Sequence, residues 1–494
     1  MTEREELNRR IGRATKWSTA TQICTKLITP ITNAILARLL APEAFGVVAT
    51  LTMVVSFAEI FTDAGFQKYL IQHEFKNEEE LQNSTNVAFW TNLLLSLVIW
   101  AGIALFAEPI AVMVGSPGCG LAVTVIGLQI PVLAFSSIQM ARYRRDFNFK
   151  TLFAVRVVTA AVPLVVTVPL ALVFRSYWAL VVGTLARDVL SAIILTARSP
   201  WKIRFWYSFQ RLKEMISFSL WTVVENISIW LTSYVGVFIV SAALNEHYLG
   251  LYKTSMSTVN AYMGVVTGAT TQVLFAALSR CQEDFAAFKS VFLKFQRMVA
   301  LLVFPMGFGL FVYRELATSI LLGEQWLETA DFLGMWSLTS AVMIVFDHYC
   351  SEVFRSIGKP KISVLMQVLH LLVLIPVLIW AAGKNYAFLT TARALVRLES
   401  ILVSCIFMQH IAGIKFTSVV KNVWPSLVAS IVMAVCGSVL RRVFPGVAWE
   451  VVTILLCVVI YAVVMFLQPA GRRQLAEIPI LKKLLRLQDS QQSK

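Results

Sequence analysis

The chain contains long apolar stretches that recur from one end to the other and are separated by short polar loops. Several of them, such as residues 361–382, have the length of about 20 residues that an α-helix needs to cross the hydrocarbon core of a membrane. Water is absent from that core, so a span must satisfy its own backbone hydrogen bonds, as a helix or as part of a closed barrel. Barrel strands alternate about every two residues between apolar and polar, whereas these runs are continuous. The sequence therefore predicts an all-α polytopic membrane protein.

Composition supports this class, because 57% of the 494 residues are hydrophobic and only 14% are charged. A soluble globular protein needs more charge to cover its surface. With about 20 residues for each span, the chain has room for about 14 helices. We predict helices at residues 17–41, 45–67, 82–107, 121–142, 151–174, 177–198, 214–243, 247–278, 288–313, 329–356, 361–382, 386–411, 420–442 and 447–468.

The positions of the basic residues give the orientation of these helices. With the N-terminus placed inside, 31 of the 43 Lys and Arg residues fall in inner segments, and five fall within spans. The outer segments hold only seven, which are Arg38, Arg175, Lys253, Arg314, Lys384, Arg441 and Arg442. Cytoplasmic loops are enriched in Lys and Arg. We therefore expect an even number of helices and both termini in the cytoplasm.

The net charge of +15 does not indicate a nucleic-acid partner, because the basic residues lie in short loops and form no patch with interleaved aromatic residues. The seven cysteines have no paired spacing and no CxxC, so we expect neither a metal site nor a disulfide framework. No cofactor is predicted. The N-terminus is polar and charged for some sixteen residues, unlike a signal peptide.

A basic and aromatic segment, residues 199–213, divides the helices into two groups of six. We predict a cytoplasmic amphipathic lead-in, an N-lobe of helices 1–6, this inter-lobe linker, a C-lobe of helices 7–12, two further helices and a cytoplasmic basic tail. Their bounds are residues 1–16, 17–198, 199–213, 214–411, 412–470 and 471–494.

The two groups also carry a weak internal repeat. The turn Glu43–Val47 after the first helix has a similar counterpart at His247–Leu251 after the seventh helix. The basic turn Arg145–Lys150 after helix 4 likewise has a counterpart at Lys359–Lys361 after helix 10. Two like halves of six helices are typical of a transporter with a central pathway between its lobes, which works by alternating access.

Four stretches of the sequence resemble the polysaccharide flippase family, the Wzx-type and colanic-acid-type exporters of the multidrug/oligosaccharidyl-lipid/polysaccharide superfamily. They are LARLLAPEAFGVVA, FTDAGFQKYLIQ, RYRRDFNFK and RSIGKPKISVL, and the resemblance covers residues 10 to 470. It implies a V-shaped fold of two lobes plus two helices.

The resemblance also implies a function, which is to move a polyprenyl-pyrophosphate-linked oligosaccharide repeat unit from the inner to the outer leaflet of the bacterial cytoplasmic (inner) membrane. The product would serve surface polysaccharide biosynthesis, as exopolysaccharide, capsule or O-antigen. Expected partners are this lipid-linked oligosaccharide, membrane lipids and a polysaccharide polymerase or export complex, with the chain itself a monomer. The family supplies no ligand-contact motif, so candidate site residues come from their charge and depth alone.

Ionisable side chains at membrane depth are costly, at about 2.5–3.5 kcal/mol each on insertion scales, and they usually face a cavity or a partner. Among the ionisable residues of the predicted spans we single out twelve: Lys26, Glu59, Asp63, Arg156, Arg187, Asp188, Glu225, Asp347, Glu352, Arg393, Arg397 and Glu399. So many charges favour helices that line a cavity.

The cationic candidates for substrate binding are Lys26, Arg187, Arg393 and Arg397. Arg393 and Arg397 are one turn apart, so they share a helix face and predict an anion-binding stripe. Arg187 suits bidentate contact with a phosphate. The structural alternatives stay open: pairing with Glu225 or Asp188 for Arg187, and snorkelling or pairing within the bundle for the other two arginines.

The acidic candidates for coupling or gating are Glu59, Asp63, Glu225 and Asp347. Glu59 and Lys26 are predicted to lie at similar depths on antiparallel helices. In one interpretation Lys26 contacts the substrate head group and Glu59 modulates its charge. In the other, the two residues form a structural ion pair. Asp63 is nearer the inner surface and suits a gate or cap. Asp347, next to His348, is a candidate for titration during coupling, although a single histidine in a span is more often packed.

Two other functions compete with the flippase. A cation-coupled small-molecule or drug exporter of the same superfamily would carry fewer cavity cations and one buried acidic cluster. An enzyme, such as a glycosyltransferase or polymerase, would need catalytic motifs or a large outer loop, and the short predicted loops contain no DxD or HExxH. Outward movement of two negative charges gains about 2.3 kcal/mol per charge per 100 mV, so a coupling ion is not required.

Overall fold

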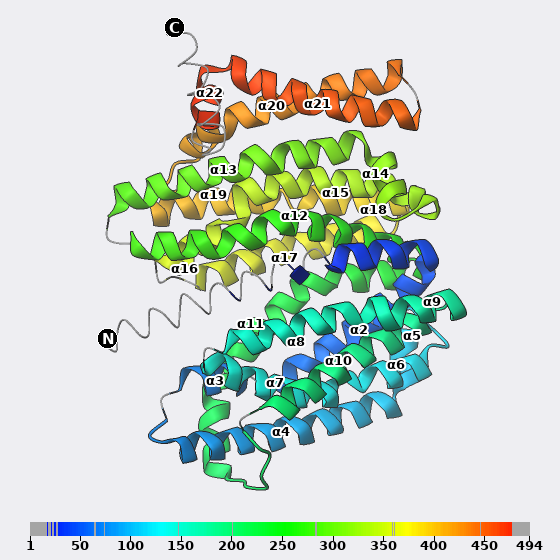
Figure 1. The fold of residues 1–494 in the computed structure, drawn as a ribbon, viewed down its shortest axis with the longest axis vertical. Helices are drawn as coiled ribbons and strands as arrows, with labels where there is room; N and C mark the ends of the chain where they lie inside the picture. Colours follow the sequence, from blue (N-terminus) through cyan, green and yellow to red (C-terminus); the bar gives the residue numbers. More distant parts are fainter. Residues whose placement is uncertain are drawn as a thin grey trace. The chain divides into compact units, whose positions relative to one another are not determined.

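The computed structural model describes residues 17, 21, 24–25, 28–63, 66–73, 75–146, 148–199, 201–281, 284–357, 359, 361–444 and 446–476. All regular secondary structure among these residues is helical, with no strand (Figure 1). Within this part of the chain, eleven helices are long and apolar enough to cross a membrane. The predicted all-α polytopic fold is confirmed, while the full count of 14 helices stays a prediction and the lead-in 1–16 lies outside the described residues.

The chain divides into two compact units. Unit 1 consists of residues 1–254 and 378–386, and unit 2 consists of residues 255–377 and 387–494. The predicted lobes and linker, with a boundary at residues 199–213, stay a prediction.

Unit 1 is built around α2 and α7. The buried residues Val47, Leu51 and Val55 of α2 pack against Val123 and Ile126 of α6. Helix α7 contacts α2, α3, α4 and α10, and α11 packs on α2 (Figure 1). After a helical segment at residues 28–39, the helices are α2 (Pro42–Asp63), α3 (Phe66–Gln72), α4 (Glu78–Leu105), α5 (Ala107–Met113), α6 (Gly120–Gly127), α7 (Gln129–Arg145), α8 (Phe149–Val162), η1 (Pro163–Thr167), α9 (Val168–Phe174), α10 (Trp178–Arg198) and α11 (Phe209–Ala243).

Unit 2 is centred on α13, which packs on both α15 and α20, and α20 in turn pairs with α21 (Figure 1). Helix α12 (Glu246–Arg280) begins in unit 1 and continues into unit 2. The other elements are α13 (Phe285–Val312), α14 (Arg314–Leu321), η2 (Glu324–Thr329), α15 (Ala330–Met343), η3 (Ile344–His348), α16 (Cys350–Ser356), α17 (Lys361–Ala382), α18 (Tyr386–Val396), α19 (Glu399–Ala412), α20 (Phe416–Val443), α21 (Val447–Leu467) and α22 (Pro469–Ala476).

Two of the predicted continuous helices of unit 2 are interrupted near their middle. The tenth contains a π-helical turn, η3 (Ile344–His348), between α15 and α16. The twelfth breaks between α18 and α19, at Arg397 and Leu398. Single π-turns are frequent at functional sites. Irregular backbone at membrane depth is tolerated where it lies within protein or beside a cavity. The interruptions therefore direct attention to Asp347 and Arg397.

In unit 1, the two segments that form the internal repeat lie in the first turns of helices α2 and α12, and they contact each other. A Cβ atom on Gly46 would overlap the carbonyl oxygen of Glu246, and one on Gly250 would overlap the carbonyl oxygen of Pro42. The Nδ1 atom of His247 lies 2.6 Å from Oε1 of Glu43 across the same contact. Each turn thus needs glycine because the backbone of the other turn lies directly against it.

We expect Gly46→Ala to destabilise the protein, because its methyl group has no room beside Glu246. Overpacking of this kind costs about 1–3 kcal/mol. The matched control is Gly102→Ala in α4, where an added Cβ meets nothing within 4 Å. That control should be neutral or stabilising by up to about 1 kcal/mol. Thermal unfolding of the purified variants measures both effects, and equal melting temperatures would contradict the close contact.

Candidate functional site

Two arginines of unit 2 lie over the ring of one tryptophan. The guanidinium carbon of Arg397 lies 3.9 Å from the ring centroid of Trp336, and that of Arg393 lies 5.0 Å from it. Arg393 is buried, with 8% of its surface exposed. Desolvated cation–π contacts contribute about 2 kcal/mol each. The Trp336 ring thus stabilises both cations, and we call Trp336, Arg393 and Arg397 the arginine–tryptophan site.

The break between α18 and α19 places Arg397 in this site. The amide of Leu398 donates to the carbonyl of Leu395, and that of Ser400 donates to the carbonyl of Arg397. These bonds span three residues, so the helix tightens locally. Arg397 Nη1 donates to Ser340 Oγ at 2.9 Å, while Trp336 Nε1 donates to Asn260 Oδ1 at 3.2 Å. The ring and the guanidinium are thus held from two neighbouring helices, α15 and α12.

An acidic residue and a histidine pair accompany the arginine–tryptophan site. Ser404 donates a short hydrogen bond to the Asp347 carboxylate at the π-turn η3. Arg397 and His370 lie close enough to Asp347 to interact with it electrostatically. His370 Nδ1 lies 3.0 Å from Glu399 Oε2. Cationic and anionic groups from η3, α17, α19 and the break between α18 and α19 therefore lie near one another in unit 2.

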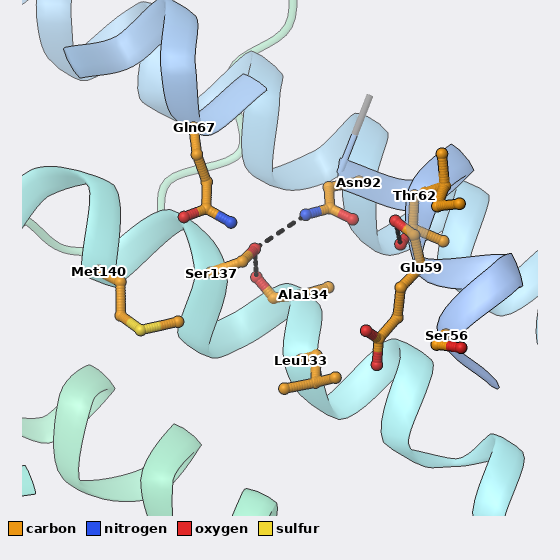
Figure 2. A pocket seen from close by; sticks show the side chains of 10 residues that line it. Ser56, Glu59, Thr62, Gln67, Asn92, Leu133, Ala134, Ser137 and Met140 are labelled. Atoms are coloured by element: carbon orange, nitrogen blue, oxygen red, sulfur yellow. Dashed lines mark hydrogen bonds between the residues drawn. The ribbon is translucent and has the colours of Figure 1, made fainter. Parts of the chain in front are cut away.

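Glu59 of unit 1 lines a separate polar cavity of about 340 Å³. Figure 2 shows its carboxylate extending from α2 toward Leu133 of α7, with the Asn92–Ser137 hydrogen bond elsewhere on the wall. The lining residues come from α2, α3, α4 and α7, and they are Ser56, Glu59, Ile60, Thr62, Gln67, Asn92, Leu133, Ala134, Ser137 and Met140. We call this the Glu59 cavity.

Arg187 is partly exposed and pairs with the residue next to it in the sequence. Its side chain is 44% exposed, and its Nε donates to Oδ1 of the adjacent Asp188 at 2.9 Å. Asp188 is buried and also accepts a hydrogen bond from Gln129 Nε2 at 2.5 Å. Arg187 therefore pairs with Asp188, as one of its two structural alternatives predicted.

The structure does not describe the side chains of three other residues that the sequence predicts to be functional. Lys26 lies outside the described residues, so its predicted proximity to Glu59 stays a prediction. Asp63 is the last residue of α2 and Glu225 lies within α11. Their side chains are outside the described part of the structure, and their gating and coupling roles stay predictions.

Sequence reasoning missed Trp336 and His370. Nothing in the local sequence of Trp336 indicates that two arginines lie over its ring. His370 could have been found, because it is an ionisable residue within the predicted span 361–382. Its partner Glu399 was recognised as a membrane-depth charge without a partner being named.

A family model described as polysaccharide biosynthesis protein matches residues 35–331, more than half of the chain. The chain belongs to this family of polysaccharide biosynthesis proteins. The family resemblance drawn from the turns and loops of the sequence is thereby confirmed.

Individual proteins give the same result. Succinoglycan biosynthesis transport protein ExoT of Rhizobium meliloti is 28% identical over 337 residues, which is 67% of this chain and 67% of that protein. Lipopolysaccharide biosynthesis protein WzxC of Escherichia coli is 19% identical and covers 71% of this chain and 68% of its own length. The solved structure of lipid II flippase MurJ, in an inward closed conformation, is similar in fold, with a TM-score of 0.76 at 12% identity. It covers 92% of this chain and 98% of its own.

We expect Asp188→Ala to lower the stability of the protein more than Arg187→Ala. Removal of the Asp188 carboxylate leaves the amide of Gln129, which is 6% exposed, without its hydrogen-bond partner, at about 1–3 kcal/mol. Removal of the half-exposed Arg187 forfeits about 0–1 kcal/mol. Thermal unfolding of both variants tests this order, and a larger loss for Arg187→Ala would show that its guanidinium carries the structural role.

Proposed function

We propose that this chain is a flippase of lipid-linked oligosaccharides. It moves a polyprenyl-pyrophosphate-linked repeat unit from the inner to the outer leaflet of the bacterial inner membrane, for the synthesis of a surface polysaccharide. Membership of the polysaccharide biosynthesis family and the similarity to transport protein ExoT support this proposal. The protein acts as a transporter and not as an enzyme.

The observation that carries the proposal is the arginine–tryptophan site. The guanidinium groups of Arg393 and Arg397 both lie over the Trp336 ring. The N–H donors of a guanidinium lie along its edge, where they match the oxygen atoms of a phosphate in bidentate geometry. Two such groups on one ring provide a binding site for an anion with two phosphates, and the ring holds both cations in place before the ligand arrives.

The environment of the site suits transport better than permanent binding. Asp347 lies close enough to Arg397 to offset part of its charge, and the His370–Glu399 pair lies near Asp347. An anion that interacts with a partly neutralised site binds less tightly and can leave it again. A site for cationic drugs would lack the two arginines, so this arrangement favours the flippase over the cation-coupled exporter.

We further propose that both termini lie in the cytoplasm and that the chain works as a monomer beside a polysaccharide polymerase or export complex. The excess of Lys and Arg in the predicted inner loops supports the orientation. The membrane potential supplies the driving force in this proposal, because the pyrophosphate carries negative charge outward.

We expect Arg397→Ala and Arg393→Ala to lower export by about tenfold each, because a hydrogen bond to a charged group contributes about 1.5–3 kcal/mol. Arg397→Lys should retain part of the activity, since it keeps the charge but loses the planar fork. The measurement is surface polysaccharide, together with lipid-linked repeat units in each leaflet, in a deletion strain complemented with each variant at equal membrane abundance.

The matched control is Arg314→Ala, which removes another arginine of unit 2 that pairs with Asp331 at 2.6 Å and lies over the Phe311 ring. Export should stay at the wild-type level in this control. Normal export by both Arg393→Ala and Arg397→Ala would show that these arginines do not bind the substrate. Normal export after deletion of the protein, without accumulation in the inner leaflet, would contradict the flippase itself, provided that no second flippase acts in the strain.

A further inference from the structure

One end of unit 2 is rich in basic residues. The described segments 284–299, 410–430 and 460–476 contain one acidic residue, Asp284, whose carboxylate accepts from two backbone amides in the first turn of α13. The same segments contain seven Lys and Arg residues, which are Lys289, Lys294, Arg297, Lys415, Lys421, Arg472 and Arg473. These segments therefore supply little negative charge to balance their own cations.

Asn422 joins three helices at this end of unit 2. Its Nδ2 donates to the carbonyl of Leu293 in α13 at 2.7 Å, and its Oδ1 accepts from Arg297 Nε at 3.0 Å. Its backbone carbonyl accepts from Gln474 Nε2 of α22 at 3.0 Å. Helix α22 also contacts α20 and α21 (Figure 1). Helices α13, α20 and α22 thus meet at Asn422.

Exposed cations surround this junction. Lys294, Lys421 and Arg473 each adjoin in sequence a residue that bonds at the junction, or Asn422 itself, and all three are exposed. Arg472 is exposed as well, and its guanidinium carbon lies 4.7 Å from the ring centroid of Phe466. We call Lys294, Lys421, Arg472 and Arg473 the basic surface. The fold therefore gathers cations that lie far apart in the sequence.

The opposite end of α20 is arranged differently. Arg441 Nε donates to Glu450 Oε1 at 2.7 Å, and its Nη2 donates to the carboxylate of Glu315. The chain thus provides two carboxylates for a cation at that end. A group of cations without such carboxylates creates a positive potential that attracts anions from outside the protein. The basic surface is therefore suited to an external anionic partner.

The position of the basic surface along α20 favours a lipid as this partner. Helix α20 has 28 residues and is about 42 Å long, whereas the hydrocarbon core of a membrane is about 30 Å thick. Its first turns, which contain Lys421, therefore extend to the level of the headgroups. Phe416 and Trp424 are exposed nearby on the same helix, and aromatic residues are enriched at the membrane interface. In the proposed orientation this end faces the cytoplasm, where the leaflet contains anionic lipids.

We infer that the basic surface binds the headgroup of an anionic phospholipid of the cytoplasmic leaflet. The lipid phosphate accepts hydrogen bonds from the Lys and Arg side chains, and the acyl chains lie along the apolar surface of α20. A phosphatidylcholine headgroup carries its own cation, so the basic surface selects against it. The inference concerns a lipid of the membrane and not the transported cargo.

The test is native mass spectrometry of the full-length protein, purified in detergent, with dioleoyl-phosphatidylglycerol or dioleoyl-phosphatidylcholine. We expect the phosphatidylglycerol to bind at least about tenfold more tightly, because several cations act on its phosphate. Lys421→Gln should weaken phosphatidylglycerol binding about fivefold, and the triple variant Lys294→Gln, Lys421→Gln and Arg473→Gln about a hundredfold. Phosphatidylcholine binding should not change in either variant.

Three controls identify the site and the ligand. Arg442→Gln removes an exposed arginine at the other end of α20 and should leave phosphatidylglycerol binding unchanged. Arg397→Ala should also leave it unchanged, because Arg397 belongs to the arginine–tryptophan site. Inorganic phosphate should not displace the lipid, since it has no acyl chains. If the triple variant does not fold, Lys421→Gln and Arg442→Gln form the decisive pair.

Equal affinities for the two lipids, or phosphatidylglycerol binding that Lys421→Gln and the triple variant leave unchanged, would overturn the lipid site. An equal loss in Arg442→Gln would show a general effect of charge and would overturn it as well. Displacement by inorganic phosphate would indicate a site for free anions instead of a lipid. Loss of lipid binding in Arg397→Ala alone would place the lipid at the arginine–tryptophan site and contradict the inference.

Discussion

The free-energy cost of a charge inside the membrane is the constraint on which the rest of this structure depends. An isolated arginine at membrane depth is expensive, so it needs a partner. In unit 2 the partner is an aromatic ring, which stabilises Arg393 and Arg397 together. A break in the helix brings Arg397 to Ser340 of the neighbouring helix. A π-turn places Asp347 where Ser404 can donate to it. The irregular backbone of these helices therefore occurs where charges must be satisfied.

The two units offer different chemistry to a ligand. Unit 2 contains cations with planar hydrogen-bond donors, which suit a pyrophosphate. Unit 1 contains the Glu59 cavity, whose wall combines hydroxyl, amide and carboxylate groups with apolar side chains. A lipid-linked oligosaccharide has both an anionic linkage and a glycan.

Much of the fold could be predicted from the sequence, because the membrane requires long apolar helices. Helix α17 begins and ends at the predicted residues, Lys361 and Ala382. The proximity of Arg393 and Arg397 also follows from their spacing, although the helix breaks at Arg397. The site itself could not be predicted, since the Trp336 stack joins residues about 60 positions apart and the break at Arg397 has no glycine or proline to mark it. The repeat was visible in the turns, but the mutual contact of Gly46 and Gly250 requires the folded chain.

The most direct test of the central claim is transport by the purified protein. Proteoliposomes would contain the chain and a polyprenyl-pyrophosphate-linked oligosaccharide with a nitrobenzoxadiazole label on its glycan, and dithionite would be added outside. We predict that the wild type brings the label of the inner leaflet within reach of dithionite, so that fluorescence falls below the level in protein-free liposomes. We also predict that a double variant, Arg393→Ala with Arg397→Ala, gives the protein-free level. A wild-type trace equal to that of protein-free liposomes, with the protein folded and inserted, would contradict the account.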